Sequence, residues 1–387
     1  MTAAVYKPMA ALAASGFAVD VICADSFCKE LPLDQSLVPF AEQSFGTITR
    51  LRPSTSLISR WRSSSRIFSR IPDLMTVLQE SAYETLMDLD LTKYNAVMTW
   101  SPFHSINAVM ARVKRARKNV RWIAQFSDPW AGNPLEINRL TKFWNQRHEP
   151  MTVQAADSIV HSSRFSLELM LRNHPESIRR KANVIPHAFD SALFPQRPKA
   201  QNSKIVLRYV GVLYGRRSPE HLFQALASLF DRRPDLRQRL CVEFVGLISP
   251  EMLQSPAALS LPEGSIRSVG NVSFVDSLAS MYDADILILI EANIRQNLFL
   301  PSKLSDYMGS QTPMVGLVPP GASEDAFEKL NCWYARPDDI EGISSAVEGA
   351  VVHVMTQPDA PWADESYRAT FSGTQIARQF TDIIARF

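Results

Sequence analysis

The sequence lacks the features that mark a membrane-spanning, metal-binding or nucleic-acid-binding protein. No apolar run approaches the ~18 residues that a membrane-spanning helix needs. None of the four cysteines stands in a C-x-x-C pair, which argues against a zinc or redox site and favours buried free thiols in a reducing cytosol. A formal net charge of +2 gives no general case for nucleic acid, so we expect no such partner.

The amino terminus also lacks a recognisable signal peptide. The residues after Met1 provide neither the charged region nor the apolar region of such a segment, and we expect a cytoplasmic protein. A hydrophobic content of 46% with 21% charged residues is typical of a globular protein with an ample core. At 387 residues, the chain is long enough for two domains.

Positive charge is concentrated between Arg50 and Arg70. This stretch holds six arginines and no acidic residue, with Trp61 and Phe68 interleaved. Basic and aromatic residues in such a mixture suit the surface of an anionic membrane, so we predict peripheral contact with the inner face of the plasma membrane. The alternatives are a solvated face, or arginines that reach a phosphate-bearing ligand.

Short apolar segments alternate with helical patterns in two successive series. The first series has expected strands at residues 17–23, 95–100, 120–126, 158–161 and 183–187. The second has them at 205–211, 241–246 and 286–290, after a linker rich in Pro and polar residues at 190–203, and a helix is expected at 363–387. This alternation predicts an α/β protein with two doubly wound, Rossmann-like domains and a ligand cleft between them.

The segment after the strand at 286–290 predicts an anion site. Residues 300–308 read LPSKLSDYM, and Pro-Ser at the start of a helical segment builds a helix N-terminus at the carboxyl end of a strand. Ser302 lies in this terminus, Lys303 adds a positive charge and Asp306 adds an acceptor for sugar hydroxyls. Together they indicate a nucleotide diphosphate. The ordinary alternative is a capped helix with an exposed Lys303–Asp306 pair.

A second turn, GVLYGRRSP at residues 211–219, follows a strand and precedes a helical pattern. Gly211 would let backbone N–H groups approach a ligand closely, and Arg217 would clamp a phosphate through two hydrogen bonds. With Lys303, Arg217 would direct two cations at one diphosphate. The alternative is a surface arginine beside a helix start.

Two further polar residues follow strands in the first series. Asp128 comes just after the strand at 120–126, and His104 comes after the strand at 95–100. Carboxylates and imidazoles at strand ends are candidates for acid–base or hydroxyl-binding roles. The alternatives are an Asx turn or helix cap for Asp128 and a structural role for His104.

Taken in order, these segments resemble the retaining nucleotide-sugar glycosyltransferases of the GT-B fold, in the group often called family 4. Residues 183–190 resemble an N-V-I-P-N-G-F-D stretch, 211–219 a G-x-L-Y-x-x-R-x-P phosphate loop, and 301–313 a P-S-K-L-x-E-Y donor motif. Residues 99–105 and 128–130 resemble the T-x-S-P-x-H-S and R-D-P-W stretches of bacterial exopolysaccharide transferases. The resemblance covers nearly the whole chain.

The resemblance implies a metal-independent transfer of a sugar from a UDP- or GDP-sugar to a saccharide or lipid-linked acceptor, in the synthesis of a cell-surface polysaccharide. It implies no further cofactor. Arg217 and Lys303 would bind the donor diphosphate, Asp306 the ribose, and Asp128 and His104 would face the donor sugar or the acceptor. Residues 1–192 would form the acceptor-side domain and 193–365 the donor domain, with a helix at about 366–387 packing back on the first.

Three departures from the family pattern leave other functions open. Leu298 stands where the donor motif has its first Glu, Asp306 replaces the second, and Val212 stands where many relatives have Arg. Residues 2–8 already read as the helix that should follow a first strand, so we expect the central strand to be missing and the natural chain to start upstream. The alternatives are another segment in that place, or a defective domain. A catalytically dead sugar-nucleotide-binding homologue and a nucleotide-sugar epimerase of the same fold are the other candidate functions.

Overall fold

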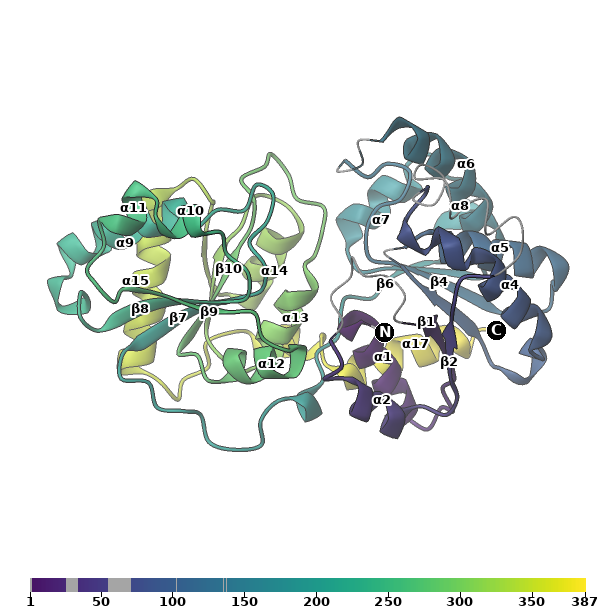
Figure 1. Ribbon diagram of the computed structural model, residues 1–387, viewed down its shortest axis with the longest axis horizontal. Coiled ribbons are helices and arrows are strands. Elements are labelled where there is room, and N and C mark those ends of the chain that lie inside the picture. Colours follow the sequence, from purple (N-terminus) through teal and green to yellow (C-terminus); the bar gives the residue numbers. More distant parts are fainter. Residues whose placement is uncertain (1, 26–33, 55–70, 102, 135, 137) are drawn as a thin grey trace. The chain divides into compact units, whose positions relative to one another are not determined.

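The computed structural model describes residues 2–25, 34–54, 71–101, 103–134, 136 and 138–387 (Figure 1). The chain forms two compact units. Unit 1 consists of Met1–Leu33, Pro39–His187 and Ile376–Phe387, and unit 2 of Asp34–Val38 and Ala188–Gln375. Both units are built on parallel sheets with helical connections, which confirms the predicted α/β class. The predicted cleft between two domains stays a prediction.

The main sheet of unit 1 has four parallel strands in the order β3-β4-β5-β6. The strands are β3 (Val97–Trp100), β4 (Trp122–Phe126), β5 (Ser158–His161) and β6 (Ala182–Val184). Every residue of β4 and β5 is buried, as expected for parallel strands that are covered on both faces. The core around them includes Trp122, Phe126 and Trp130.

A separate pair of parallel strands completes the described part of unit 1. These are β1 (Val21–Ala24) and β2 (Ile48–Leu51), which form a two-stranded sheet of their own. Ile22 and Leu51 nevertheless pack in the same core cluster as Trp122. Among the described residues, no strand joins the two sheets. The predicted absence of a central strand stays a prediction.

The helices of unit 1 connect these strands. They are α1 (Ala3–Ala14), α2 (Val38–Ser44), α4 (Gln79–Asp88), α5 (Ser105–Ala116), α6 (Arg139–Ala155), α7 (Arg164–Leu171) and α8 (Glu176–Arg179), with 3-10 turns at Leu74–Leu78 and Leu91–Lys93. Gly16, with a φ of +97°, follows α1 and ends the helix in a backbone conformation that glycine adopts readily.

The sheet of unit 2 has six parallel strands in the order β12-β11-β10-β7-β8-β9. They are β7 (Ile205–Val210), β8 (Leu240–Val245), β9 (Ile266–Gly270), β10 (Ile286–Ile290), β11 (Met314–Leu317) and β12 (Trp333–Ala335). The chain runs outward from β7 to β9 and then returns to the other side of β7 at β10. The carboxyl ends of β7 and β10 therefore mark a topological switch point, where doubly wound sheets bind ligands.

Helices cover both faces of this sheet. Figure 1 shows α9 (Glu220–Arg232), α10 (Pro250–Leu253) and α11 (Pro256–Leu259) on one side and α12 (Phe274–Tyr282) on the other. The other helices of this unit are α13 (Ser302–Gly309), α14 (Ala322–Leu330), α15 (Ile340–Thr356) and α16 (Glu365–Ala369), with 3-10 turns at Ser191–Leu193 and Pro234–Leu236. The last helix, α17 (Gly373–Ile384), lies mostly in unit 1, to which the chain returns at Ile376. Leu222 and Phe223 of α9 and Val347 of α15 are fully buried in the core of unit 2.

Several predicted elements differ from the structure, and the strand expected at 183–187 spans only Ala182–Val184. The strand expected at 17–23 starts only at Val21. The single helix expected at 363–387 is divided into α16 and α17, because the backbone between them pairs with Phe189: Phe189 N donates to Phe371 O at 2.9 Å, and Gly373 N donates to Phe189 O at 2.9 Å. Backbone that bonds to a distant residue cannot also continue a helix.

The hydroxyl of Tyr307 fixes α13 against the switch point. It accepts a hydrogen bond from Val210 N at 2.9 Å and donates to Ile288 O at 3.2 Å. Tyr307 is fully buried, so these bonds join the helix to both central strands away from water. The N-terminus of α13 is thereby held beside the ends of β7 and β10.

Tyr307→Phe should therefore lower the free energy of unfolding by about 1–3 kcal/mol, because Val210 N is left buried without its acceptor. Urea denaturation measures the change. The matched control is Tyr282→Phe, whose hydroxyl donates to Arg197 O at an exposed position and should cost about 0.5 kcal/mol or less. Equal losses in the two variants would show that the hydroxyl of Tyr307 does not hold α13.

Candidate functional site

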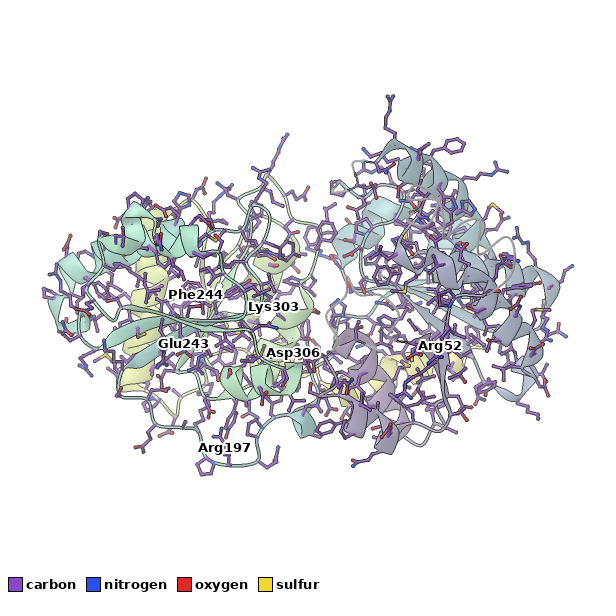
Figure 2. All side chains as sticks on the ribbon, in the orientation of Figure 1. Arg52, Arg197, Glu243, Phe244, Lys303 and Asp306 are labelled. Atoms are coloured by element: carbon purple, nitrogen blue, oxygen red, sulfur yellow. The ribbon has the colours of Figure 1, made fainter. Side chains whose placement is uncertain are left out.

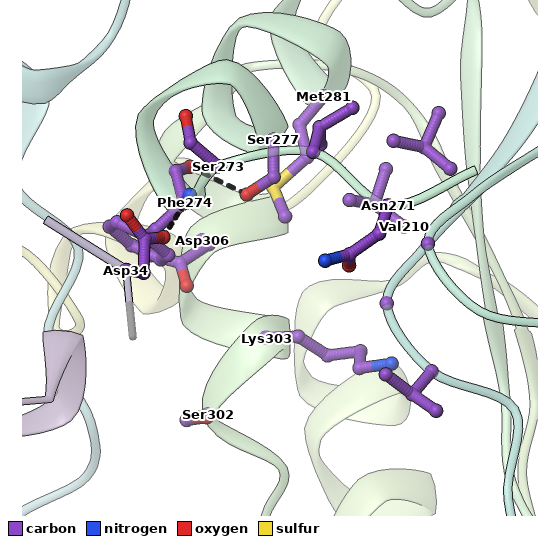
Figure 3. A pocket seen from close by; sticks show the side chains of 15 residues that line it. Asp34, Val210, Asn271, Ser273, Phe274, Ser277, Met281, Ser302, Lys303 and Asp306 are labelled. Carbon is purple, nitrogen blue, oxygen red and sulfur yellow. Dashed lines mark hydrogen bonds between the residues drawn. The ribbon is translucent and has the colours of Figure 1, made fainter. Parts of the chain in front are cut away.

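A pocket with a volume of about 260 Å³ opens at the carboxyl ends of β7 and β8 (Figure 3). Its walls are the turns after these strands, the loop that enters α12, and the first turns of α13. The lining residues with polar groups or close backbone are Asp34, Gly211, Gly246, Asn271, Ser273, Ser277, Ser302, Lys303 and Asp306. All of them belong to unit 2.

Two glycines allow the floor of this pocket to form. Gly211 has a φ of +134° and Gly246 a φ of +121°, in the range that favours glycine. A Cβ on Gly246 would overlap the carbonyl of Gly211, and a Cβ on Gly211 would lie 2.5 Å from Lys303 Nζ. Gly246 therefore allows the two turns to pack together, and Gly211 leaves space for the end of the Lys303 side chain.

The ammonium group of Lys303 is held against an aromatic ring. Its Nζ donates to the hydroxyl of Tyr209 at 2.7 Å and lies 4.3 Å from the centroid of that ring. Burial, followed by the positive charge of Arg217, lowers the pKa of Lys303 to about 7, and the charge of Glu291 opposes this shift. A bound anion would stabilise the protonated amine and so raise the pKa of Lys303 again.

Asp306 extends from the same helix as Lys303 (Figure 2). It is only 4% exposed and lines the pocket, so the alternative of an exposed Lys303–Asp306 pair is wrong. Ser302 is exposed in the first turn of α13 and also lines the pocket. The structure thus brings Gly211, Ser302, Lys303 and Asp306 together, as the sequence predicted.

Arg217 lies near the pocket but does not line it. Its guanidinium stacks over the ring of Tyr214 at 4.6 Å from the centroid, and its charge is close enough to lower the pKa of Lys303. The two predicted cations therefore share one electrostatic environment. The two-bond phosphate clamp predicted for Arg217 stays a prediction.

Sequence reasoning missed a buried carboxylate beside these cations. Glu291 directly follows β10 and accepts a hydrogen bond from Asn297 Nδ2 at 2.8 Å. Burial raises the pKa of Glu291, while the charges of Arg217 and Lys303 lower it. Its position at the end of the strand beside the switch point was the available signal. Tyr209, the partner of Lys303, was missed because its side chain lies within a strand.

The two predicted acceptor-side residues lie in unit 1. His104 stacks on Trp130 with 4.7 Å between ring centroids, and its Nδ1 has no hydrogen-bond partner among the described residues. Burial, followed by the charge of His161, lowers the pKa of His104 to about 3, so the imidazole is neutral at physiological pH. Burial raises the pKa of the Asp128 carboxyl. These surroundings suit hydrogen bonding by His104 better than proton transfer.

Several sequence predictions concern residues that the structure describes only in part. Of the basic stretch from Arg50 to Arg70, residues 55–70 lie outside the described residues, and Arg52 forms an ion pair with Asp25 at 2.6 Å. Cys28 also lies outside them, whereas Cys241 and Cys332 are buried free thiols. Within the described ranges, no helix is long and apolar enough to cross a membrane. No group of three or more candidate metal ligands occurs there either.

Solved structures share this fold, whereas no family model and no curated protein matches the sequence. A glycosyltransferase from Rickettsia africae is 14% identical with a TM-score of 0.67, covering 99% of this chain and 93% of its own. Anabaena Alr3699/HepE, solved in complex with UDP, is 14% identical with a TM-score of 0.63, covering 95% of this chain and 100% of its own. The lipopolysaccharide outer core galactosyltransferase WaaB is 12% identical with a TM-score of 0.60, covering 99% and 94%. The chain therefore has the GT-B fold.

Gly211→Ala should lower the free energy of unfolding by about 2–3 kcal/mol, because its φ of +134° lies outside the regions that L-residues adopt, whereas the contact of the new Cβ with Lys303 Nζ can be relieved by a shift of that flexible side chain. Gly215→Ala is the matched control. Gly215 also has a positive φ, +63°, but has open space around its Cβ position, so it should cost only about 1 kcal/mol. Urea denaturation compares the two variants, and a smaller loss for Gly211→Ala would contradict the backbone strain assigned to that position.

Lys303→Met should be more stable than the wild type at pH 6, with a gap that narrows as pH rises. A lysine in the unfolded chain keeps a pKa of about 10.4, so between about pH 7 and pH 10 the unfolded state binds more protons than the folded state. The wild type therefore becomes more stable as pH rises from about 7 to about 10. Below about pH 7 the amine is protonated in both states, so the destabilisation caused by its buried charge does not change with pH.

Urea denaturation of both proteins at several values between pH 6 and pH 9 measures this gap. Lys329→Met serves as the control, since Lys329 lies on the surface of α14 and pairs with Asp325 at 2.8 Å. Its difference from the wild type should not change across the window. A stability difference between Lys303→Met and the wild type that does not depend on pH would contradict the lowered pKa of Lys303.

Proposed function

We propose that this chain is a glycosyltransferase that uses a nucleotide-diphosphate sugar as its donor. The observation that carries the proposal is the pocket of unit 2, where Lys303 and the N-terminus of α13 meet the glycine turns after β7 and β8. A diphosphate is favoured by three features together: the N-terminus of a helix, glycine turns whose backbone N–H groups a ligand can approach closely, and a buried amine. The UDP complex of Anabaena HepE, which has the same fold, supports this ligand class.

In the proposed reaction, the diphosphate is the leaving group. Negative charge grows on its oxygens as the bond to the sugar breaks, and Lys303, Arg217 and the N-terminus of α13 would stabilise that charge. Protonated Lys303 is favoured once the diphosphate is bound, because the anion offsets the burial that lowers its pKa. Asp306 would accept hydrogen bonds from the ribose hydroxyls, and its burial keeps its carboxylate in place.

The finer parts of the proposal rest on the motifs of the sequence. The donor is a UDP- or GDP-sugar, the anomeric configuration is retained, and no metal is required because cationic side chains and a helix end take its place. The acceptor is a saccharide or lipid-linked sugar of a cell-surface polysaccharide. WaaB, a galactosyltransferase of the lipopolysaccharide outer core with the same fold, supports this class of acceptor. Asp128 and His104 of unit 1 would bind acceptor or donor hydroxyls.

One structural observation favours a second candidate, a non-catalytic homologue that binds a sugar nucleotide. The β1–β2 pair and the β3–β6 sheet of unit 1 are separate in the described residues, whereas the sheet of unit 2 is continuous. A protein of this kind would keep the pocket of unit 2 and bind the donor without transferring its sugar.

The test is a thermal-shift screen with UDP, GDP, ADP, CMP and their sugar conjugates in the presence of a chelator, followed by product analysis with saccharide acceptors. One nucleotide class should raise the melting temperature, because a ligand of the native state stabilises it. Lys303→Ala should remove the shift, and Arg217→Ala should reduce turnover by about 100-fold.

The exposed-surface variant Lys329→Ala should change neither readout. A shift that persists in Lys303→Ala would place the nucleotide elsewhere and refute the site. Binding without turnover across the acceptors would favour the non-catalytic homologue.

A further inference from the structure

One wall of the pocket comes from a distant part of the chain. The segment Asp34–Val38 belongs to unit 2, although Pro39–His187 belongs to unit 1. Figure 3 shows Asp34 beside Phe274, at the N-terminus of α12. The carboxylate of Asp34 accepts a hydrogen bond from Phe274 N, and Ser36 Oγ accepts one from Val275 N at 3.4 Å. The segment is thus bound to the first turn of α12 at two points.

Asp34 places a fixed negative charge at this helix end. Burial raises the pKa of its carboxyl, but the hydrogen bonds from Ser36 and Phe274 outweigh burial and lower it overall, so the group is ionised. A carboxylate at a helix N-terminus neutralises the positive end of the helix dipole. The end of α12 is therefore already occupied by an anion of the chain itself, which disfavours a phosphate at that place.

The pocket consequently has two chemically different ends. The amine of Lys303 lies against Tyr209 and Gly211, and Figure 3 shows it pointing away from Asp34. Phosphates are favoured at the Lys303 end. The end formed by Asp34 and Phe274 offers a carboxylate, which accepts hydrogen bonds and repels anions.

We propose that Asp34 is a specificity-determining residue of the nucleotide site. Its carboxylate accepts a hydrogen bond from an N–H or O–H group of the nucleoside half and so orients the nucleotide with its diphosphate at Lys303. Oδ1 accepts from Ser36 N at 2.8 Å and Oδ2 from Phe274 N. The side chain of Ser36 also donates to this carboxylate. Since an ionised carboxylate has about four acceptor positions, about one is left for a ligand. This inference rests on the proposed function of the pocket.

Calorimetric titration of the full chain with UDP and with inorganic pyrophosphate tests the inference. Asp34→Asn keeps an oxygen that can accept from Phe274 N but removes the charge. It should weaken UDP binding at least about tenfold, as expected for the loss of a charged hydrogen bond. Pyrophosphate has no nucleoside, so its affinity should stay unchanged or increase.

Ser36→Ala is the matched control within the same segment. It removes the contact with Val275 N and the side-chain hydrogen bond to Asp34, but it keeps the negative charge and the hydrogen bonds from Ser36 N and Phe274 N. It should therefore weaken UDP binding clearly less than Asp34→Asn does. A titration with 2′,3′-dideoxy-UDP then identifies the donor group. A loss in Asp34→Asn that persists with this ligand supports a base N–H as the donor, and a loss that disappears supports a ribose hydroxyl.

Two results would overturn the role of Asp34. One is wild-type affinity of Asp34→Asn for UDP. The other is an equal change for UDP and pyrophosphate, which would mean that the carboxylate only repels anions. Wild-type protein that binds no nucleotide would instead refute the proposed function, so the two failures are distinguishable.

Discussion

The close approach of a buried amine to two glycine turns is the constraint on which the pocket of unit 2 depends. The amine of Lys303 lies next to Gly211, and Gly211 packs so closely against Gly246 that a Cβ on Gly246 would overlap the carbonyl of Gly211. The hydroxyl of Tyr307 joins α13 to β7 and β10, so the helix that carries Lys303 cannot move away without breaking buried hydrogen bonds. The glycine turns and the hydrogen bonds of Tyr307 thereby hold the amine of Lys303 at a position where water solvates it poorly.

This arrangement is the physical basis for the proposed binding of an anion at the site. An amine with a pKa lowered to about 7 gains most when an anion enters and restores its charge. Three carboxylates lie near this amine or along the pocket. Glu291 is buried, Asp306 lines the pocket, and Asp34 caps the N-terminus of α12. Opposite charges at the two ends would then align a nucleotide along the pocket.

The sequence predicted the local parts of this site and missed those made by tertiary contacts. The P-S-K-L motif indicated the start of α13 and placed Ser302 and Lys303 at it, because capping and strand–helix succession are local signals. The role of Asp34 was not predictable, since it depends on a segment of unit 2 that is more than 200 residues from Phe274 in sequence. The break between α16 and α17 was missed for the same reason, because Phe189 supplies the pairing.

The most direct test of the central claim is a crystal structure of the chain with bound UDP. The account predicts phosphate oxygens within about 3 Å of Lys303 Nζ and of the first backbone N–H groups of α13. It also predicts the nucleoside toward Phe274 and Asp34. A nucleotide bound away from Lys303, or bound with its phosphates at the end of α12, would contradict it.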